Sequence, residues 1–96
     1  MAGSIAARYG DLPLADRRFA QALARSPDDA YATLERGAIA SNAGRQAQAL
    51  RLLARAARLQ PRDELTREAL RVAQRGQRIS VARLNRSILE QALQLR

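Results

Sequence analysis

A repeat spacing of 34 residues constrains the fold of this chain more than any other feature. Ten of the 27 residues from Gly3 to Asp29 recur unchanged 34 positions later, between Gly37 and Asp63. Seven of the ten are Gly, Ala or Pro, which are residues that end helices or let two helices approach closely. A repeat of this length is typical of stacked helical hairpins, each burying its apolar face against the next. The sequence therefore predicts an all-α fold of about three antiparallel hairpins.

Residues that end or cap helices divide the chain into six expected helices. Gly10, Gly44 and Gly76 each follow an apolar segment of helical periodicity, as a left-handed C-cap would. Pro27 and Pro61 mark two further helix ends, because the residue before proline avoids helical angles. The side chains expected to cap the following helices are those of Asp11, Asp28, Asp63 and Ser80. The expected helices span residues 3–9, 12–25, 29–43, 45–59, 64–75 and 81–95.

The repeat also predicts how the domain is organised. A chain of 96 residues is long enough for one core, so we expect a single domain over residues 1–96. Within it, residues 1–29 form a partial first repeat and residues 30–63 a full repeat. Residues 64–96 then form a degenerate hairpin or a C-terminal cap.

The full repeat resembles the tetratricopeptide repeat family. The small residues Gly37, Gly44, Ala49 and Ala56, followed by Pro61, match the pattern of that family. This resemblance implies a right-handed superhelical stack of antiparallel helix hairpins, a solenoid that binds partners rather than catalysing reactions. The chain departs from the pattern at Thr33, where the family has a large aromatic residue, at Arg36, where it has Leu, and in the third hairpin at Arg71, Arg78, Arg83 and Glu90.

The resemblance also implies where a partner binds. In this family the first helices of the hairpins line a concave groove that holds extended or helical peptides. The groove positions in this chain are Tyr31, Leu34, Ala38, Asn42, Leu65, Glu68, Val72 and Arg75. Their chemistry is mostly apolar with a polar rim, which suits an apolar peptide or an amphipathic helix. For the leucines, packing between hairpins is the competing interpretation.

The positive charge of the chain opens a second interpretation. All 17 basic residues are Arg, and the net charge is +8. Four of them, Arg51, Arg55, Arg58 and Arg71, lie on helical stripes that could bind an anion, nucleic acid or an anionic membrane surface. No aromatic residue interleaves with them, which disfavours base stacking, and a solvated face explains the same spacing.

The composition argues against an enzyme. The chain has no His and no Cys, which removes the commonest acid–base residue and the usual zinc ligands. The acidic residues sit mostly at expected helix starts, where they complement the helix dipole. We therefore expect no catalytic residue, no cofactor and no metal.

Exposed apolar residues at the two ends of the stack indicate self-association. The candidates are Ile5, Tyr9, Ile88, Leu89 and Leu93. No apolar run is long enough to span a bilayer. Together these features predict a cytoplasmic protein-interaction scaffold of unknown partner, in a larger bacterial protein or assembly, and they leave open whether that larger protein is attached to a membrane. An electrostatic adaptor is the alternative.

Overall fold

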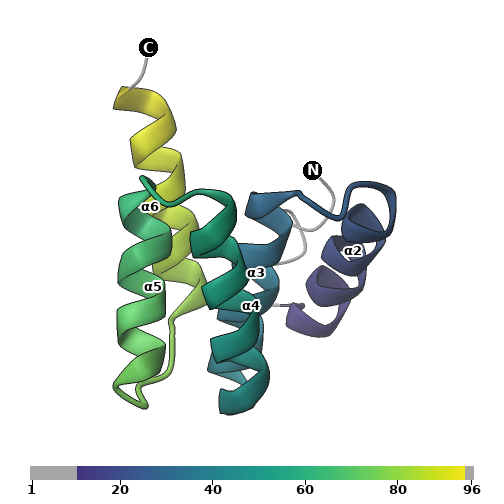
Figure 1. Cartoon of the computed structure of the whole chain (residues 1–96), viewed down its shortest axis with the longest axis horizontal. Coiled ribbons are helices and arrows are strands. Elements are labelled where there is room, and N and C mark those ends of the chain that lie inside the picture. Colours follow the sequence, from purple (N-terminus) through teal and green to yellow (C-terminus); the bar gives the residue numbers. More distant parts are fainter. Residues whose placement is uncertain (1–10, 95–96) are drawn as a thin grey trace.

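A computed structural model describes residues 11–94, and this part of the chain is helical without any strand (Figure 1). None of its helices is long and apolar enough to cross a membrane. The helix expected over residues 3–9 lies outside the described residues. The other five lie within two residues of their expected ends: α2 (Leu12–Arg25), α3 (Ala30–Asn42), α4 (Gln46–Leu59), α5 (Glu64–Gln74) and α6 (Val81–Gln94).

The helix ends follow from local chemistry. Asp11 and Asp63 cap α2 and α5, and each accepts a hydrogen bond from a backbone N–H three residues on. The expected cap of α3 at Asp28 is wrong, because Asp29 accepts the hydrogen bond from the Ala32 N–H at 3.0 Å. Gly44 and Gly76 adopt φ of 82° and 75°, the left-handed region that glycine occupies without strain. Each lies within a Schellman motif that closes α3 or α5.

The 34-residue period of the sequence is also a period of the helix boundaries. Helices α2 and α4 each contain 14 residues, and both their first and last residues are 34 positions apart. The residues that end them, Ser26 and Gln60, share a φ of −137°. Helices α3 and α5 also begin 34 residues apart, at Ala30 and Glu64. The sequence repeat therefore encodes a repeated pair of helices.

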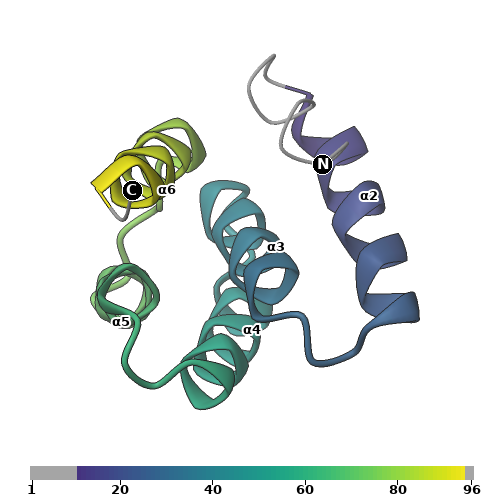
Figure 2. The ribbon, with the colours of Figure 1, turned by 90° about the horizontal axis from the view of Figure 1, so that it is seen from above.

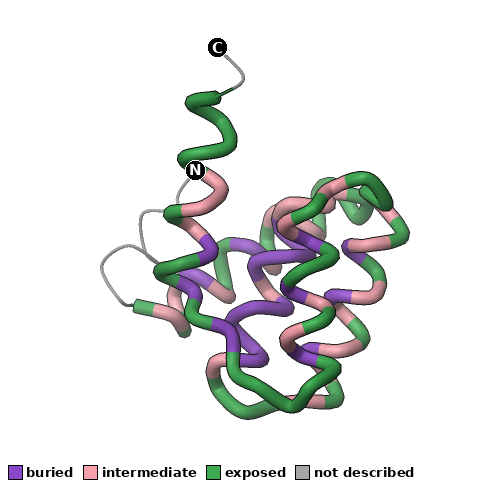
Figure 3. The backbone as a smooth tube through the Cα atoms, turned by 90° about the vertical axis from the view of Figure 1, so that its left-hand side faces the viewer, coloured by how far each residue is buried: buried purple, intermediate pink, exposed green. Residues whose placement is uncertain are grey.

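Helix α3 is the centre of the described fold. It contacts α2, α4, α5 and α6, and nine of its 13 residues are buried. Figure 2 shows α3 surrounded by the other helices, and Figure 3 shows the buried residues gathered in the middle of the molecule. Around it, Phe19 of α2 and Leu53 of α4 supply the largest buried apolar side chains. These two residues are 34 positions apart, so the repeat places equivalent side chains on either side of α3.

Two departures from the tetratricopeptide pattern in α3 have partners of their own. The guanidinium of Arg36 pairs with the Asp16 carboxylate of α2, with an Nε–Oδ1 distance of 3.0 Å. Buried Thr33 donates its hydroxyl to the Asp29 carbonyl at 2.9 Å. Helix α3 is thus joined to α2 by a charge pair where the pattern has Leu.

The α3–α4 and α5–α6 pairs pack differently. A Cβ atom added at Gly37 of α3 would lie 2.8 Å from the Leu53 side chain of α4, so these two helices touch closely. Helices α5 and α6 are joined by the non-helical linker 75–80, and a groove of about 580 Å³ lies between them. The third hairpin expected from the repeat is therefore open.

The contact at Gly37 gives a first prediction. Gly37→Ala should lower the free energy of unfolding by up to about 2 kcal/mol, because overpacking costs roughly 1–3 kcal/mol and the gain in helix propensity returns about 1 kcal/mol. Urea unfolding would measure this loss. In a Leu53→Ala background the added methyl group has room, so the same substitution should become neutral or stabilising. Equal losses in both backgrounds would contradict a contact between Gly37 and Leu53.

Candidate functional site

A groove between α5 and α6 combines an apolar floor with polar groups around its edge. Leu65, Ala69 and Val72 of α5 face Leu84 of α6 across it. Polar groups from the linker and from both helices complete the lining: Glu68, Gln77, Arg78, Ser80, Arg83 and Ser87. This α5–α6 groove can hold apolar side chains of a bound segment at its floor and polar groups at its rim. Three of the predicted groove residues, Leu65, Glu68 and Val72, lie here.

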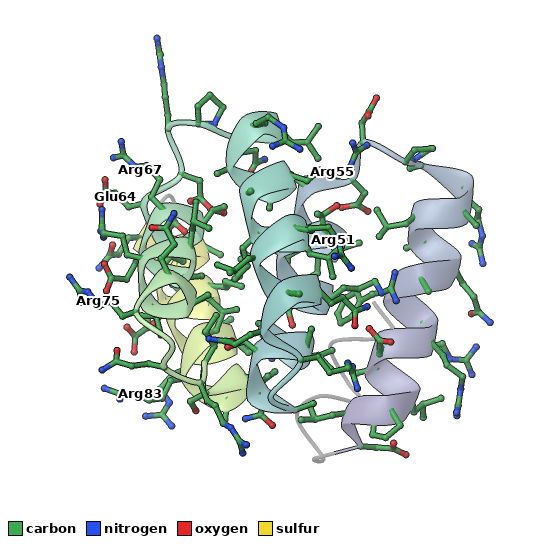
Figure 4. All side chains as sticks on the ribbon, turned by 60° about the horizontal axis from the view of Figure 1, so that its bottom comes forward. Arg51, Arg55, Glu64, Arg67, Arg75 and Arg83 are labelled. Atoms are coloured by element: carbon green, nitrogen blue, oxygen red, sulfur yellow. The ribbon has the colours of Figure 1, made fainter. Side chains whose placement is uncertain are left out.

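The rim of the α5–α6 groove is positively charged. Glu68, its only carboxylate among the lining residues, is paired with Arg71 at an Oε2–Nη2 distance of 2.6 Å. Arg78 and Arg83 have no carboxylate partner among residues 11–94. Arg75, a predicted groove residue, is exposed and lies on the same side of the molecule as Arg83, as Figure 4 shows. The rim therefore favours a ligand with negative charge beside its apolar residues.

The predicted residue Asn42 binds the chain itself. Its amide Nδ2 donates to the Ile79 carbonyl at 3.1 Å. The neighbouring Ser41 hydroxyl accepts from the Ile79 N–H at 3.0 Å and donates to the Gln77 carbonyl. These hydrogen bonds hold the linker between α5 and α6 against the end of α3.

The remaining predicted groove residues of α3 belong to the core or to its edge. Leu34 is 4% exposed and Ala38 is 0% exposed, so neither is accessible to a partner in this conformation. The cause is the central position of α3, which contacts a helix on every side. Tyr31 is half-buried, and its ring meets that of Phe19 edge-on at a centroid distance of 5.7 Å.

Glu35, which no sequence pattern distinguishes, is the most unusual residue of this region. Its side chain is 0% exposed, and neither carboxyl oxygen has a hydrogen-bond partner. The other buried polar side chains of residues 11–94 (Thr33, Ser41 and Thr66) all form hydrogen bonds. Burial raises the pKa of Glu35 from 4.5 to about 7, and the nearby Asn85 amide of α6 offsets part of that rise. Asn85 Nδ2 is itself buried, so an incompletely hydrogen-bonded polar pair lies between α3 and α6.

The four predicted anion-binding arginines do not form one surface. Arg51, Arg55 and Arg58 line a shallow hollow on α4, whereas Arg71 lies on α5 and pairs with Glu68. Arg55 also donates to the Pro27 carbonyl at 3.1 Å and lies 3.6 Å from the Asp28 carboxylate. Figure 4 places Arg51 and Arg55 on α4 toward α2, and Arg75 and Arg83 on the opposite side.

The predicted self-association residues are only partly described. Ile5 and Tyr9 lie outside the described residues. Ile88 is half-buried against the core, while Leu89 and Leu93 are 47% and 57% exposed. Both leucines lie in the C-terminal half of α6, and the C-terminal end of this helix extends past α5 (Figure 1). The last turns of α6 thus carry exposed apolar side chains.

Comparison of this chain with known protein families, with curated proteins and with solved structures gives no match. Within residues 11–94, no three acidic side chains lie close enough together to hold a metal ion.

The buried carboxyl of Glu35 predicts a pH-dependent stability. Its pKa is higher in the folded chain than in the unfolded chain, so the folded state binds more protons between pH 4.5 and about 7. The contribution of Glu35 to stability is therefore complete below pH 4.5 and is lost as the pH rises through about 7. The size of this loss is about 3 kcal/mol at 1.4 kcal/mol per pKa unit.

Urea unfolding of Glu35→Gln between pH 4.5 and 8.5 would test this assignment. The variant should lose this component of the pH dependence and be more stable than the parent at pH 8. Glu90→Gln, which changes an exposed carboxyl on α6, is the matched control and should follow the parent curve. Parallel curves for Glu35→Gln and the parent would show that Glu35 carries no shifted pKa.

Proposed function

We propose that this chain is a helical-repeat interaction module of the tetratricopeptide type, which binds an amphipathic helix or extended segment of a partner protein. The bound segment lies on the surface shared by α3 and α5, the first helices of successive helix pairs, which we call the α3–α5 face. The segment enters at the α5–α6 groove, where this face is open. The observation that carries the proposal is the groove itself, with an apolar floor of Leu65, Val72 and Leu84.

Two further observations support a repeat module. The period of 34 residues recurs in the boundaries of α2 and α4 and in the starts of α3 and α5. Gly37 permits the close helix contact that the small residues of the family provide. The right-handed superhelical stacking of the family remains part of this proposal.

The charges at the groove narrow the class of partner. Arg78 and Arg83 lie at the rim beside apolar side chains, and Arg75 lies nearby. A segment with apolar residues at spacings of three and four, flanked by Asp or Glu, would fit both the apolar floor and the positively charged rim of the groove. The alternative, an electrostatic adaptor for nucleic acid or membranes, has less support. Its arginines are divided between α4 and α5, and two of them are paired with carboxylates.

Selection from a displayed library of random 15-residue peptides on the full chain would test this function. The selected peptides should share apolar residues at helical spacing and an acidic flank. Val72→Glu in the groove should weaken their binding at least about tenfold, because it places an uncompensated charge among apolar side chains. Leu65→Gln should weaken peptide binding less than Val72→Glu does, because it removes an apolar contact without adding a charge.

The matched control is Ala47→Glu, which adds the same charge on an exposed position of α4. It should leave the affinity unchanged within about twofold, since surface charges at this distance are screened. If the peptides bind Val72→Glu with the same affinity as the parent, the groove is not their binding site. An affinity that falls steeply between 50 and 200 mM salt for all selected peptides would favour the electrostatic adaptor.

A further inference from the structure

Helix α6 lies on the face of the molecule that the sequence assigns to a partner. It contacts α3 and α5, and within the described part of the chain it contacts neither α2 nor α4. Seen from above, α6 lies on the side of α3 and α5 that is turned away from α4 (Figure 2). The position of α6 on the α3–α5 face is therefore that of a bound segment rather than that of the second helix of a tight hairpin.

The segment that contains α6 has the pattern of an amphipathic ligand. Val81 and Leu84 are buried and Ile88 is half-buried, at spacings of three and four residues. Ile79, just before them, is buried as well, and its backbone is held by Ser41 and Asn42 of α3. Apolar anchors at helical spacing together with main-chain hydrogen bonds are how a peptide would bind this face.

The contact between α6 and α3 also contains a buried polar pair whose hydrogen bonding is incomplete. Glu35 is 0% exposed, and the buried Asn85 amide across from its carboxyl offsets only part of the cost of burial. A buried polar group without a hydrogen bond destabilises the contact that buries it. Moving α6 away from α3 would expose both side chains to water. This would remove the free-energy cost of burying them.

The rest of α6 adds little to hold it in place. Only Val81 and Leu84 of its 14 residues are buried, and residues 89–94 are all exposed. Figure 3 shows this exposed end extending beyond the remainder of the described chain. An element with few buried side chains and much exposed backbone opens at lower free energy than the core.

We propose that residues 77–94 are an internal occupant of the α3–α5 face, which opens as a unit and gives way to a partner helix of the same apolar pattern. This inference rests on the proposed function for the identity of the occupant that replaces it. The opening itself is a property of the chain alone. When α6 is displaced, the polar residues Glu35, Ser41 and Asn42 of α3 become available to the incoming segment.

The groove contacts of the partner change as residues 77–94 move away. Arg78, Arg83 and Leu84 are then contacts of the partner only as it enters the groove. Leu65 and Val72 of α5 are the groove contacts that remain afterwards.

Hydrogen exchange of the full chain, read by mass spectrometry at pH 8, would test the opening. Peptides from residues 77–94 should exchange faster than those from α3 and α4. Asn85→Asp places a second carboxylate across from Glu35 and should raise exchange in residues 77–94 at least about tenfold, while exchange in α4 stays unchanged. Gln91→Glu is the matched control, since it makes the same amide-to-carboxylate change on the exposed end of α6 and should have little effect.

A second variant should have the opposite effect on the exchange rate. Glu35→Gln removes the buried charge and should slow exchange in residues 77–94 relative to the parent. Equal exchange rates in α6 and α4, a rise spread evenly over all helices in Asn85→Asp, or no slowing in Glu35→Gln would each overturn the proposal.

A fluorescent peptide with the sequence of residues 77–94 would test the occupancy. The peptide should bind the full-length Asn85→Asp chain at least about tenfold more tightly than the parent chain, because the variant leaves the face open more often. Equal or weaker binding to the variant would show that α6 is not an occupant of this face but a fixed wall of the groove. Faster exchange in Asn85→Asp without any peptide selected from the library would retain the opening and reject the proposed function.

Discussion

The close approach of α3 and α4 is the constraint on which the rest of the structure depends. Gly37 brings α3 against Leu53, and no larger residue fits there without movement of that side chain. Because the chain has few aromatic residues and many alanines, its core must gain density through such close contacts rather than through large side chains. With α4 on one side and α2 on the other, α3 becomes the central helix, and every described helix is arranged around it.

The features that local chemistry determines could be predicted from the sequence. Asp11, Asp63, Gly44 and Gly76 fix helix ends through hydrogen bonds within a few residues, so the helix bounds follow from sequence positions alone. The exception is the cap of α3, where the sequence favours Asp28 and the structure has Asp29. Two adjacent aspartates offer the same capping side chain, and only the backbone conformation of the turn selects between them. The all-helical architecture follows from the same signals.

The arrangement of α6 could not be predicted, because it depends on contacts between residues about 36 to 50 positions apart. Ser41 and Asn42 bind the linker near Ile79, and Glu35 lies opposite Asn85. The periodicity places Asn42 and Ala38 on one face of α3 but gives no information about what covers that face. It likewise cannot show that Glu35 is buried, since a glutamate in an amphipathic helix is ordinarily exposed. The sequence thus indicates the α3–α5 face but not its occupant.

Under the proposed function, the same covering of α3 would link the stability of this chain to its binding. A carboxyl buried by α6 favours a protonated, closed state, and ionisation of Glu35 above a pH of about 7 weakens the contact with α6. A partner helix that offers a well-placed hydrogen-bond donor to Glu35 would reduce the cost of burying its carboxyl, because Asn85 offsets only part of that cost. Binding free energy would then come partly from relief of an unfavourable burial already present in the free chain, in addition to apolar contact. A partner lacking such a donor would have to compete with α6 on apolar contacts alone, and its affinity would depend on the charge state of a single residue.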